Sequence, residues 1–129
     1  FSEKIIKADG LIIITPEYNH GYPGELKLLL DMLYKEYARK PVGICGVSKG
    51  AFGGSRAVEQ LKQMAIEFHM TPIREAVYFS FVQSLFNEDG SIKDESYSEK
   101  ISKFMQEFLW YAKVLKKGRE EDIDNLPLI

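Results

Sequence analysis

Apolar residues in this chain alternate between short continuous runs and longer stretches with helical periodicity. The run Leu11 to Ile14 is typical of a strand that is buried on both faces of a parallel sheet, and Val42 to Val47 is a second apolar run. The pattern predicts strands at residues 11–14, 42–47 and about 76–79, and helices at about 24–37, 54–68 and 97–116. Strands that alternate with helices predict an α/β fold with a parallel sheet and right-handed crossovers.

The expected helices differ in how their apolar residues are distributed. Helix 54–68 has a single stripe facing the sheet, formed by Val58, Leu61, Met64, Ala65 and Phe68. Helix 24–37 is apolar on most sides, which an amphipathic surface helix is not. We therefore expect it to be covered on more than one side. Its second cover is either another helix of the same domain or, the interpretation that we favour, a second copy of the chain.

Several boundaries follow from local signals. Residues 2–7 read as the end of a helix. Pro72 is expected to end helix 54–68, because a proline disfavours helical geometry in the residue before it. Residues 80–96 read as a loop with a turn at Asp89-Gly90. Lysines in the last turn suit the negative end of the final helix, and Gly118 is expected to end it. The tail from Arg119 to Ile129 is a candidate docking segment for a partner subunit.

Composition limits the class of protein. The 129 residues, of which 45% are hydrophobic and 28% charged, suit one domain spanning residues 1–129 with a real core. The net charge of −2 leaves no basic face for nucleic acid, and no apolar run approaches the roughly 20 residues that span a bilayer. The lone Cys45 excludes a disulfide framework and favours a cytoplasmic location. Two histidines and one cysteine argue against a zinc site.

Two loops follow the first two expected strands. Residues 15–24 read Thr-Pro-Glu-Tyr-Asn-His-Gly-Tyr-Pro-Gly, and residues 46–57 read Gly-Val-Ser-Lys-Gly-Ala-Phe-Gly-Gly-Ser-Arg-Ala. In open α/β sheets ligands bind outside the carboxyl ends of the strands, so both loops lie where a ligand would bind. Taken alone, either loop is more simply a structural connection; together, in this order and separated by one helix, they point to a binding site.

The two loops together resemble those of the NAD(P)H-dependent FMN reductase family. The resemblance implies a flavodoxin-like fold, a three-layer sandwich around a parallel sheet, of which this chain represents the later strands and helices. It also implies FMN as cofactor and NADPH or NADH as electron donor. A small acceptor (a flavin, quinone, azo compound or metal ion) would then take the electrons. The alternative is a flavodoxin-like electron carrier or a non-catalytic FMN-binding module; such carriers tend to be strongly acidic, and this chain is close to neutral.

The resemblance also implies a set of cofactor-binding residues. The backbone of Pro16, Glu17, Tyr18 and Asn19 would wrap the ribityl chain and one edge of the isoalloxazine. The pyrimidine end of the flavin would be approached by Ser48, Lys49, Gly50, Phe52 and Gly53. No catalytic residue is expected, because the cofactor carries the chemistry of hydride transfer and the protein binds and orients it. The family further implies a homodimer or tetramer.

Other residues in these loops have simpler expected roles. Arg56 stands in the first turn of a helix, where a cation is unfavourable, so we expect it to pair with a carboxylate. Lys49 is either a solvated lysine, which we favour, or a charge that neutralises reduced flavin or steers the phosphate of NADPH. His20 is expected to be a loop hydrogen-bonder, His69 to cap a helix end, and Cys45 to be a small core residue.

One part of the family pattern has no counterpart here. Members open with a strand, a Gly-Ser-x-Arg-type loop that holds the FMN phosphate, a helix and a second strand. Leu11 to Ile14 would then form the open edge of a three-stranded sheet, which proteins avoid because a flat apolar edge aggregates. We therefore expect this sequence to be N-terminally incomplete or to pair with a polypeptide that supplies the first two strands, and we expect FMN affinity to depend on them.

Overall fold

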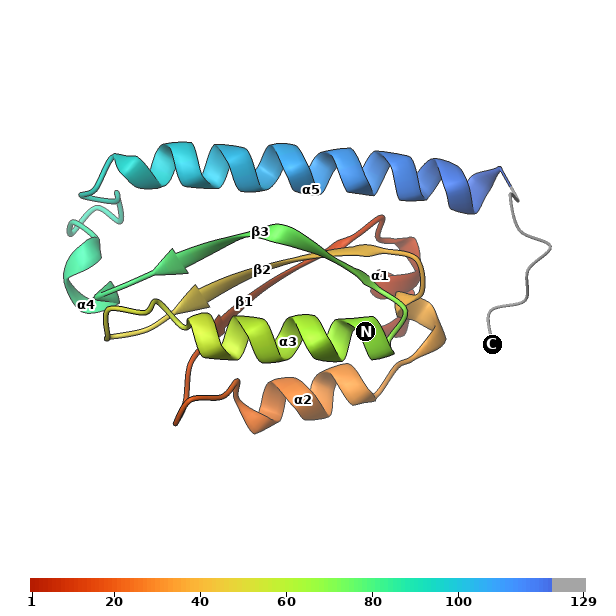
Figure 1. Ribbon diagram of the computed structural model, residues 1–129, viewed down its shortest axis with the longest axis horizontal. Coiled ribbons are helices and arrows are strands. Elements are labelled where there is room, and N and C mark those ends of the chain that lie inside the picture. Colours follow the sequence, from red (N-terminus) through yellow and green to blue (C-terminus); the bar gives the residue numbers. More distant parts are fainter. Residues whose placement is uncertain (122–129) are drawn as a thin grey trace.

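The computed structural model of the chain describes residues 1–121 (Figure 1). The helices are α1 (Ser2–Lys7), α2 (Gly24–Asp31), the 3₁₀ turn η1 (Lys35–Tyr37), α3 (Ser55–Glu67), α4 (Val82–Leu85) and α5 (Ser96–Glu120). The strands are β1 (Leu11–Pro16), β2 (Pro41–Val47) and β3 (Thr71–Phe79). Residues 122–129, which belong to the proposed docking tail, lie outside the described residues.

The three strands form one parallel sheet in the order β1-β2-β3, which confirms the predicted α/β class. Leu11 pairs with Val42 at one end of β1, and Pro16 pairs with Val47 at the other. All three strands point the same way, so their carboxyl ends meet at one edge of the sheet, on the left in Figure 1. This arrangement brings the loops that follow β1 and β2 together, as the sequence predicts.

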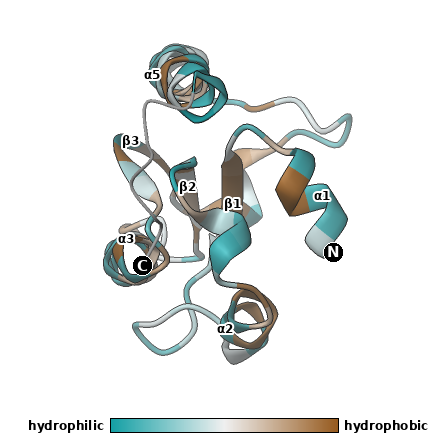
Figure 2. Cartoon of the chain, turned by 90° about the vertical axis from the view of Figure 1, so that its right-hand side faces the viewer, coloured by the Kyte–Doolittle hydropathy of each residue, from teal (hydrophilic) through white to brown (hydrophobic). Residues whose placement is uncertain are grey.

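Helices lie on both faces of the sheet and make three layers. The long helix α5 covers one face, and α2 and α3 cover the other (Figures 1 and 2). The predicted stripe of α3 is largely confirmed, since Val58, Leu61 and Ala65 are buried in the core on that side. Under α5, Phe104 packs so closely on β2 that a Cβ atom at Gly43 would come within 2.5 Å of its ring. Cys45 belongs to this second core, as expected.

The strand predicted to be buried on both faces, Leu11 to Ile14, is buried on one face only, whereas the central strand β2 is buried on both. All but the last residue of β2 are buried. In β1, by contrast, Ile12 and Ile14 are 42% and 67% exposed, while Leu11 and Ile13 pack against the core from the other face. The reason is that α5 lies over β2 and β3 and not over β1, which forms the edge of the sheet.

The predicted helix over residues 24–37 is wrong in its second half. Helix α2 ends at Asp31, and a 3₁₀ turn follows. The chain turns there because the fully buried Tyr37 folds back and donates a hydrogen bond from its hydroxyl to the carbonyl of Leu30, at 3.1 Å. The outer face of α2 is not covered by any described residue, since Leu28 and Met32 are 72% and 69% exposed.

Three other boundaries differ from the prediction. The third strand begins at Thr71 instead of residue 76, and includes Pro72, which an edge strand tolerates. The expected loop 80–96 contains α4. Helix α5 does not end at Gly118, because Arg119 in its last turn is held by the carboxylate of Asp9 and the carbonyl of Arg39.

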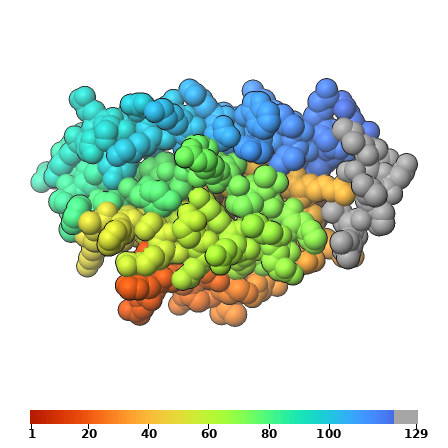
Figure 3. Space-filling model, in the orientation of Figure 1, coloured from red at the N-terminus to blue at the C-terminus, as the bar shows by residue number. Residues whose placement is uncertain are grey.

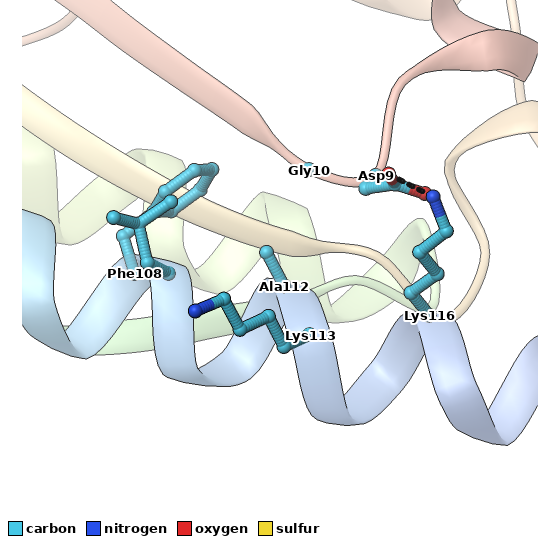
Figure 4. Close-up of a pocket in the computed structure, with 7 residues that line it drawn as sticks. Asp9, Gly10, Phe108, Ala112, Lys113 and Lys116 are labelled. Atoms are coloured by element: carbon cyan, nitrogen blue, oxygen red, sulfur yellow. Dashed lines mark hydrogen bonds and ion pairs between the residues drawn. The ribbon is translucent and has the colours of Figure 1, made fainter.

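The same end of α5 is tied to the turn before β1. The ammonium group of Lys116 donates to the carboxylate of Asp9 at 2.8 Å, at one side of a pocket that Phe108 lines from the other (Figure 4). This hydrogen bond lowers the pKa of Asp9, and the charges of Lys116 and Arg119 act in the same direction against the effect of burial. The long last helix is therefore fixed to the sheet at both its aromatic middle and its charged end.

Candidate functional site

The loops that follow β1 and β2 enclose a depression at the carboxyl edge of the sheet. Its volume is about 380 Å³, within the usual range for small-molecule sites. It is lined by Pro16, Glu17, Tyr18, Val47, Ser48, Lys49 and Val82. In Figure 3 the yellow segment around residues 48–54 lies against the orange-red segment around residues 15–22 at this end of the molecule. Two segments about 30 residues apart in sequence therefore form one site.

The first loop is a tight turn held by its own backbone. The amide of Glu17 donates to the carbonyl of Val47 and so extends the pairing of β1 with β2 by one residue. Tyr18 and Gly21 then exchange two hydrogen bonds, of 2.8 and 3.0 Å, and close the turn. Between them Asn19 and His20 have positive φ angles of 50° and 70°, a conformation that asparagine tolerates better than most residues.

The second loop is held by its carbonyl groups. Four successive carbonyl oxygens, those of residues 48–51, all accept hydrogen bonds from the segment Ser80–Gln83 that follows β3. The bonds come from the Val82 amide to Ser48, the Gln83 side chain to Lys49, the Phe81 amide to Gly50 and the Ser80 hydroxyl to Ala51. Phe81 has a positive φ of 49°, which lets its amide and the next one reach the loop from the same turn.

The backbone amides of this loop, unlike its carbonyl groups, are mostly left unpaired by the residues that the structure describes. In the part of the chain that the structure describes, none of the backbone amides of residues 49–53 donates a hydrogen bond to a protein acceptor. A polar backbone group that is not paired within the protein must be satisfied by water or by a ligand. The loop therefore offers a run of donors beside the depression, and its carbonyls are already used.

Glycines set the path of this loop. At Gly46 a Cβ atom would lie 2.4 Å from the carbonyl oxygen of Gly53, and at Gly54 a Cβ atom would lie 2.9 Å from the amide nitrogen of Val47. Gly53 and Gly54 also have positive φ angles of 55° and 81°. Backbone therefore packs directly on backbone where β2 ends and α3 begins, and only glycine permits that approach.

An ion pair connects the two loops. Arg56 in the first turn of α3 contacts the carboxylate of Glu17 through its side chain at 2.5 and 2.6 Å and through its backbone amide at 3.2 Å, which confirms the expectation that Arg56 pairs with a carboxylate. Burial by itself raises the pKa of Glu17, but the hydrogen bonds and charge of Arg56 outweigh it and lower the pKa overall. The guanidinium also lies 5.3 Å from the ring centroid of Phe52.

The predicted site residues fall into two groups. Five of them, Pro16, Glu17, Tyr18, Ser48 and Lys49, line the depression. The other four do not: Asn19, Gly50 and Phe52 are exposed on the loops, and Gly53 is buried with its Cα against the backbone of Tyr78. These nine assignments remain predictions about cofactor binding.

Two lining residues were missed by the sequence reasoning. Val47 is the last residue of β2, and its place at a strand end could have suggested it. Val82 belongs to the segment after β3, which carried no motif and was expected to be plain loop. Of the histidines, His20 accepts a hydrogen bond from Gln60 through its carbonyl, and His69 lies just beyond the end of α3, with its ring against Tyr34.

Within residues 1–121 no cluster of side chains could hold a metal ion. In the same residues no helix has the length and apolar character to cross a membrane. What the described site offers is backbone donors and a depression whose lining combines the apolar residues Pro16, Val47 and Val82 with polar residues that include one lysine. Such donors suit the carbonyl oxygens and ring nitrogens of a flavin, so the residues present fit an FMN ring.

Comparison with known proteins agrees with this geometry. The model of the NADPH-dependent FMN reductase family matches residues 1–84, well over half of the chain. This chain belongs to that family. Among solved structures, the family member resembles FerB, a flavoenzyme NAD(P)H:(acceptor) oxidoreductase from Paracoccus denitrificans, with a TM-score of 0.77 and 26% identity over 87% of this chain. The predicted flavodoxin-like fold is thereby confirmed.

Two curated relatives in the family are similar over most of the chain. One, from Vibrio ruber, is named NADH:(hydroxy)cinnamate reductase subunit CrdA and is 36% identical over 90% of this chain. The other, a 2-hydroxy-1,4-benzoquinone reductase from a Burkholderia species, is 31% identical over 84%. The chain spans 60%, 62% and 65% of the lengths of CrdA, the benzoquinone reductase and FerB, respectively.

Proposed function

We propose that this chain carries the flavin-ring site of an FMN-dependent NAD(P)H oxidoreductase. The observation that carries the proposal is the loop after β2. In the part of the chain that the structure describes, the carbonyl groups of residues 48–51 all accept hydrogen bonds, and the amides of residues 49–53 donate none to a protein acceptor. A loop fixed by its acceptors presents its donors without reorganisation, which favours binding of a ring edge rich in acceptors. Membership of the NADPH-dependent FMN reductase family supports FMN as that ring.

Each of the two loops would contact a different part of the cofactor. The backbone of Pro16, Glu17, Tyr18 and Asn19 would follow the ribityl chain and one edge of the ring. The pyrimidine end would lie near Ser48, Lys49, Gly50, Phe52 and Gly53. Amide donors at that end favour the negative charge of the reduced ring and so raise its reduction potential. Lys49 stands at the rim of the depression, and its charge would act in the same direction.

Bound FMN supplies the chemistry, accepting a hydride from NADH or NADPH and passing electrons to an acceptor. The chain's own contribution is to bind and orient the ring, so no acid, base or nucleophile is assigned. We place quinones first among the acceptors, because one relative is named for a quinone; flavins, azo compounds and metal ions are further candidates. We also infer a cytoplasmic location, supported by the free and buried Cys45.

The direct test is a titration of the purified protein with FMN, followed by quenching of flavin fluorescence and then by anaerobic addition of NADPH or NADH. Quenching, bleaching of the flavin and reoxidation by a quinone are expected. Quenching without bleaching by either nucleotide would replace the reductase with the alternative, an electron carrier or a binding module. Because FMN affinity is expected to depend on the two strands that have no counterpart here, the titration is carried to millimolar protein. FMN that keeps its full fluorescence at that concentration would refute the proposal.

We further propose a homodimer in which the outer face of α2 is the interface. Leu28 and Leu29 on this helix and Met32, which directly follows its last residue, are 72%, 43% and 69% exposed. Sedimentation velocity tests this: Leu28→Lys is expected to shift the protein to monomer. Val114→Lys, at a 47% exposed apolar residue of α5 on the opposite layer, is the matched control and is expected to leave the dimer intact. A monomeric wild-type protein would refute the interface.

A further inference from the structure

One face of α3 runs alongside the first loop and contacts it at three residues. Arg56, Gln60 and Met64 are spaced four residues apart, so they lie in a row along the helix. Arg56 holds the carboxylate of Glu17, the side-chain amide of Gln60 donates to the carbonyl of His20 at 3.0 Å, and the hydroxyl of Tyr22 lies 3.7 Å from the sulfur of Met64. The row therefore contacts the loop at three points, from its start to its end.

The first of these contacts also completes the end of the helix. Gly54 precedes α3 and has no side chain with which to cap it, and the close approach of Gly54 to β2 excludes any other residue there. The carboxylate of Glu17 takes over this role, since it accepts hydrogen bonds from the backbone amides of Arg56 and Ala57. Its negative charge also suits the positive end of the helix. The side chain of Glu17 is only 6% exposed, so it is committed to α3.

The second contact lies at the strained part of the loop. Asn19 and His20 have positive φ angles, which cost energy in residues other than glycine and persist only where the surroundings hold them. Gln60 holds the carbonyl of His20, and Gly21 next to it leaves room for the Gln60 side chain, 3.2 Å from where a Cβ atom would be. Without Gln60 the turn would keep only the Tyr18–Gly21 pair.

We propose that Glu17, Arg56 and Gln60 are positioning residues, whose side chains set the first cofactor loop in register with the second instead of touching the cofactor. The assignment rests on the proposed function, because it explains how backbone groups of Pro16 to Asn19 are aimed at FMN. It also gives Glu17 two separate roles: the residue lines the depression, and its carboxylate binds the start of α3. Both loops then move as one body with the start of α3.

The test compares two glutamines on the same helix. Gln60→Ala removes the contact with the loop, whereas Gln63→Ala changes an exposed residue whose side chain makes no hydrogen bond in the described part of the chain. Loss of one hydrogen bond is expected to weaken FMN binding about fivefold in Gln60→Ala, and Gln63→Ala is expected to stay within about twofold of wild type. Equal FMN affinity of the two variants would overturn the assignment of Gln60.

A double-mutant cycle tests the ion pair. Arg56→Gln and Glu17→Gln are each expected to weaken FMN binding about tenfold or more, and the double variant to be no weaker than the worse single variant by more than about twofold. If the loss of FMN affinity in the double variant equals the product of the two single losses, the two side chains act independently. That result would overturn the assignment of the ion pair. The visible circular dichroism of saturated flavin is expected to change in the same variants, because the ring is held differently, and not to change in Gln63→Ala.

Hydrogen exchange of the apo protein separates this assignment from the proposed function. Exchange of the amides in residues 17–22 is expected to rise in Arg56→Gln and Gln60→Ala and to stay at the wild-type rate in Gln63→Ala. Unchanged exchange in residues 17–22 would show that α3 does not hold the loop. A wild-type protein that binds no FMN would refute the proposed function, and the exchange result would still decide whether α3 sets the loop.

Discussion

Gly46→Ala is the substitution whose effect follows most directly from the geometry. Gly46 is buried in β2, one residue before the strand ends, and an added Cβ atom would lie 2.4 Å from the carbonyl oxygen of Gly53 and 3.0 Å from the carbonyl group of Gly54. The obstacle is backbone, and it belongs to a turn whose φ angles are already positive. Neither partner can rotate away, so the turn before α3 must move as a whole.

The size of the effect can be worked from these distances. To reach ordinary contact the turn must move by about 1 Å. Overpacking of a tight interior usually costs about 1–3 kcal/mol, and a backbone obstacle places this case at about 3 kcal/mol. At about 4 °C per kcal/mol for a domain of this size, the melting temperature should fall by about 12 °C. Displaced amides in residues 49–53 should also weaken FMN binding, by about 30-fold if two hydrogen bonds are lost.

The assay pairs thermal and urea unfolding with an FMN titration. Gly50→Ala is the matched control for stability: it is the same substitution four residues away, its nearest atom would be the Ser48 hydroxyl at 4.0 Å, and its φ is not positive. Its free energy of unfolding is expected to be unchanged or to rise by up to about 1 kcal/mol. If Gly46→Ala unfolds at the wild-type midpoint, or if Gly50→Ala loses as much stability, the backbone contact has been misjudged.

Three further substitutions probe other parts of the fold. Gly118→Ala, inside α5 with open space around its Cα, should raise the free energy of unfolding by about 0.5–1 kcal/mol; a loss of stability in urea would contradict the continuous helix. Tyr97→Phe removes a hydroxyl that donates to the Tyr78 carbonyl at 3.0 Å and accepts from the Ser80 amide at 3.3 Å; it should cost about 2 kcal/mol in the same assay, and an unchanged midpoint would refute this. Asp9 has a lowered pKa because of its hydrogen bond to Lys116, so its contribution to stability is present above the ordinary pKa of 3.8 and lost as the pH falls through the lowered value. Asp9→Asn should therefore lower the urea midpoint at pH 6 and flatten its decline between pH 5 and 2, and parallel pH profiles of variant and wild type would refute this.

The order of strands and helices was accessible from the sequence because each depends on nearby residues. The stripe of Val58, Leu61 and Ala65 predicts α3 and its buried face, and both are confirmed. The glycine- and proline-rich stretches after β1 and β2 predict loops at the carboxyl edge of a parallel sheet, where the structure has the depression. Even the pairing of Arg56 with a carboxylate follows from a local argument about the helix dipole.

The ends of the elements depended instead on residues far away in sequence. Helix α2 stops early because the ring of Tyr37 returns to the carbonyl of Leu30, and α5 passes Gly118 because Asp9, over 100 residues earlier, holds Arg119. A propensity signal of about 1 kcal/mol, such as that of one glycine in a helix, is easily overruled by contacts of this kind. Exposure of Ile12 and Ile14 likewise follows from where α5 lies, which no pattern within β1 contains.

The site shows the same division in a single residue. The sequence motif marks Glu17 as part of a ligand-binding loop, and Glu17 does line the depression. The fold decided which partner its carboxylate takes. Gly54 must lack a side chain to approach β2, so the start of α3 has no cap of its own, and the sheet brings the carboxylate of Glu17 to it. Local sequence determined where the backbone could form the two loops. Tertiary contact determined which partner each side chain takes and, within residues 1–121, which amides of the second loop are left without a protein acceptor.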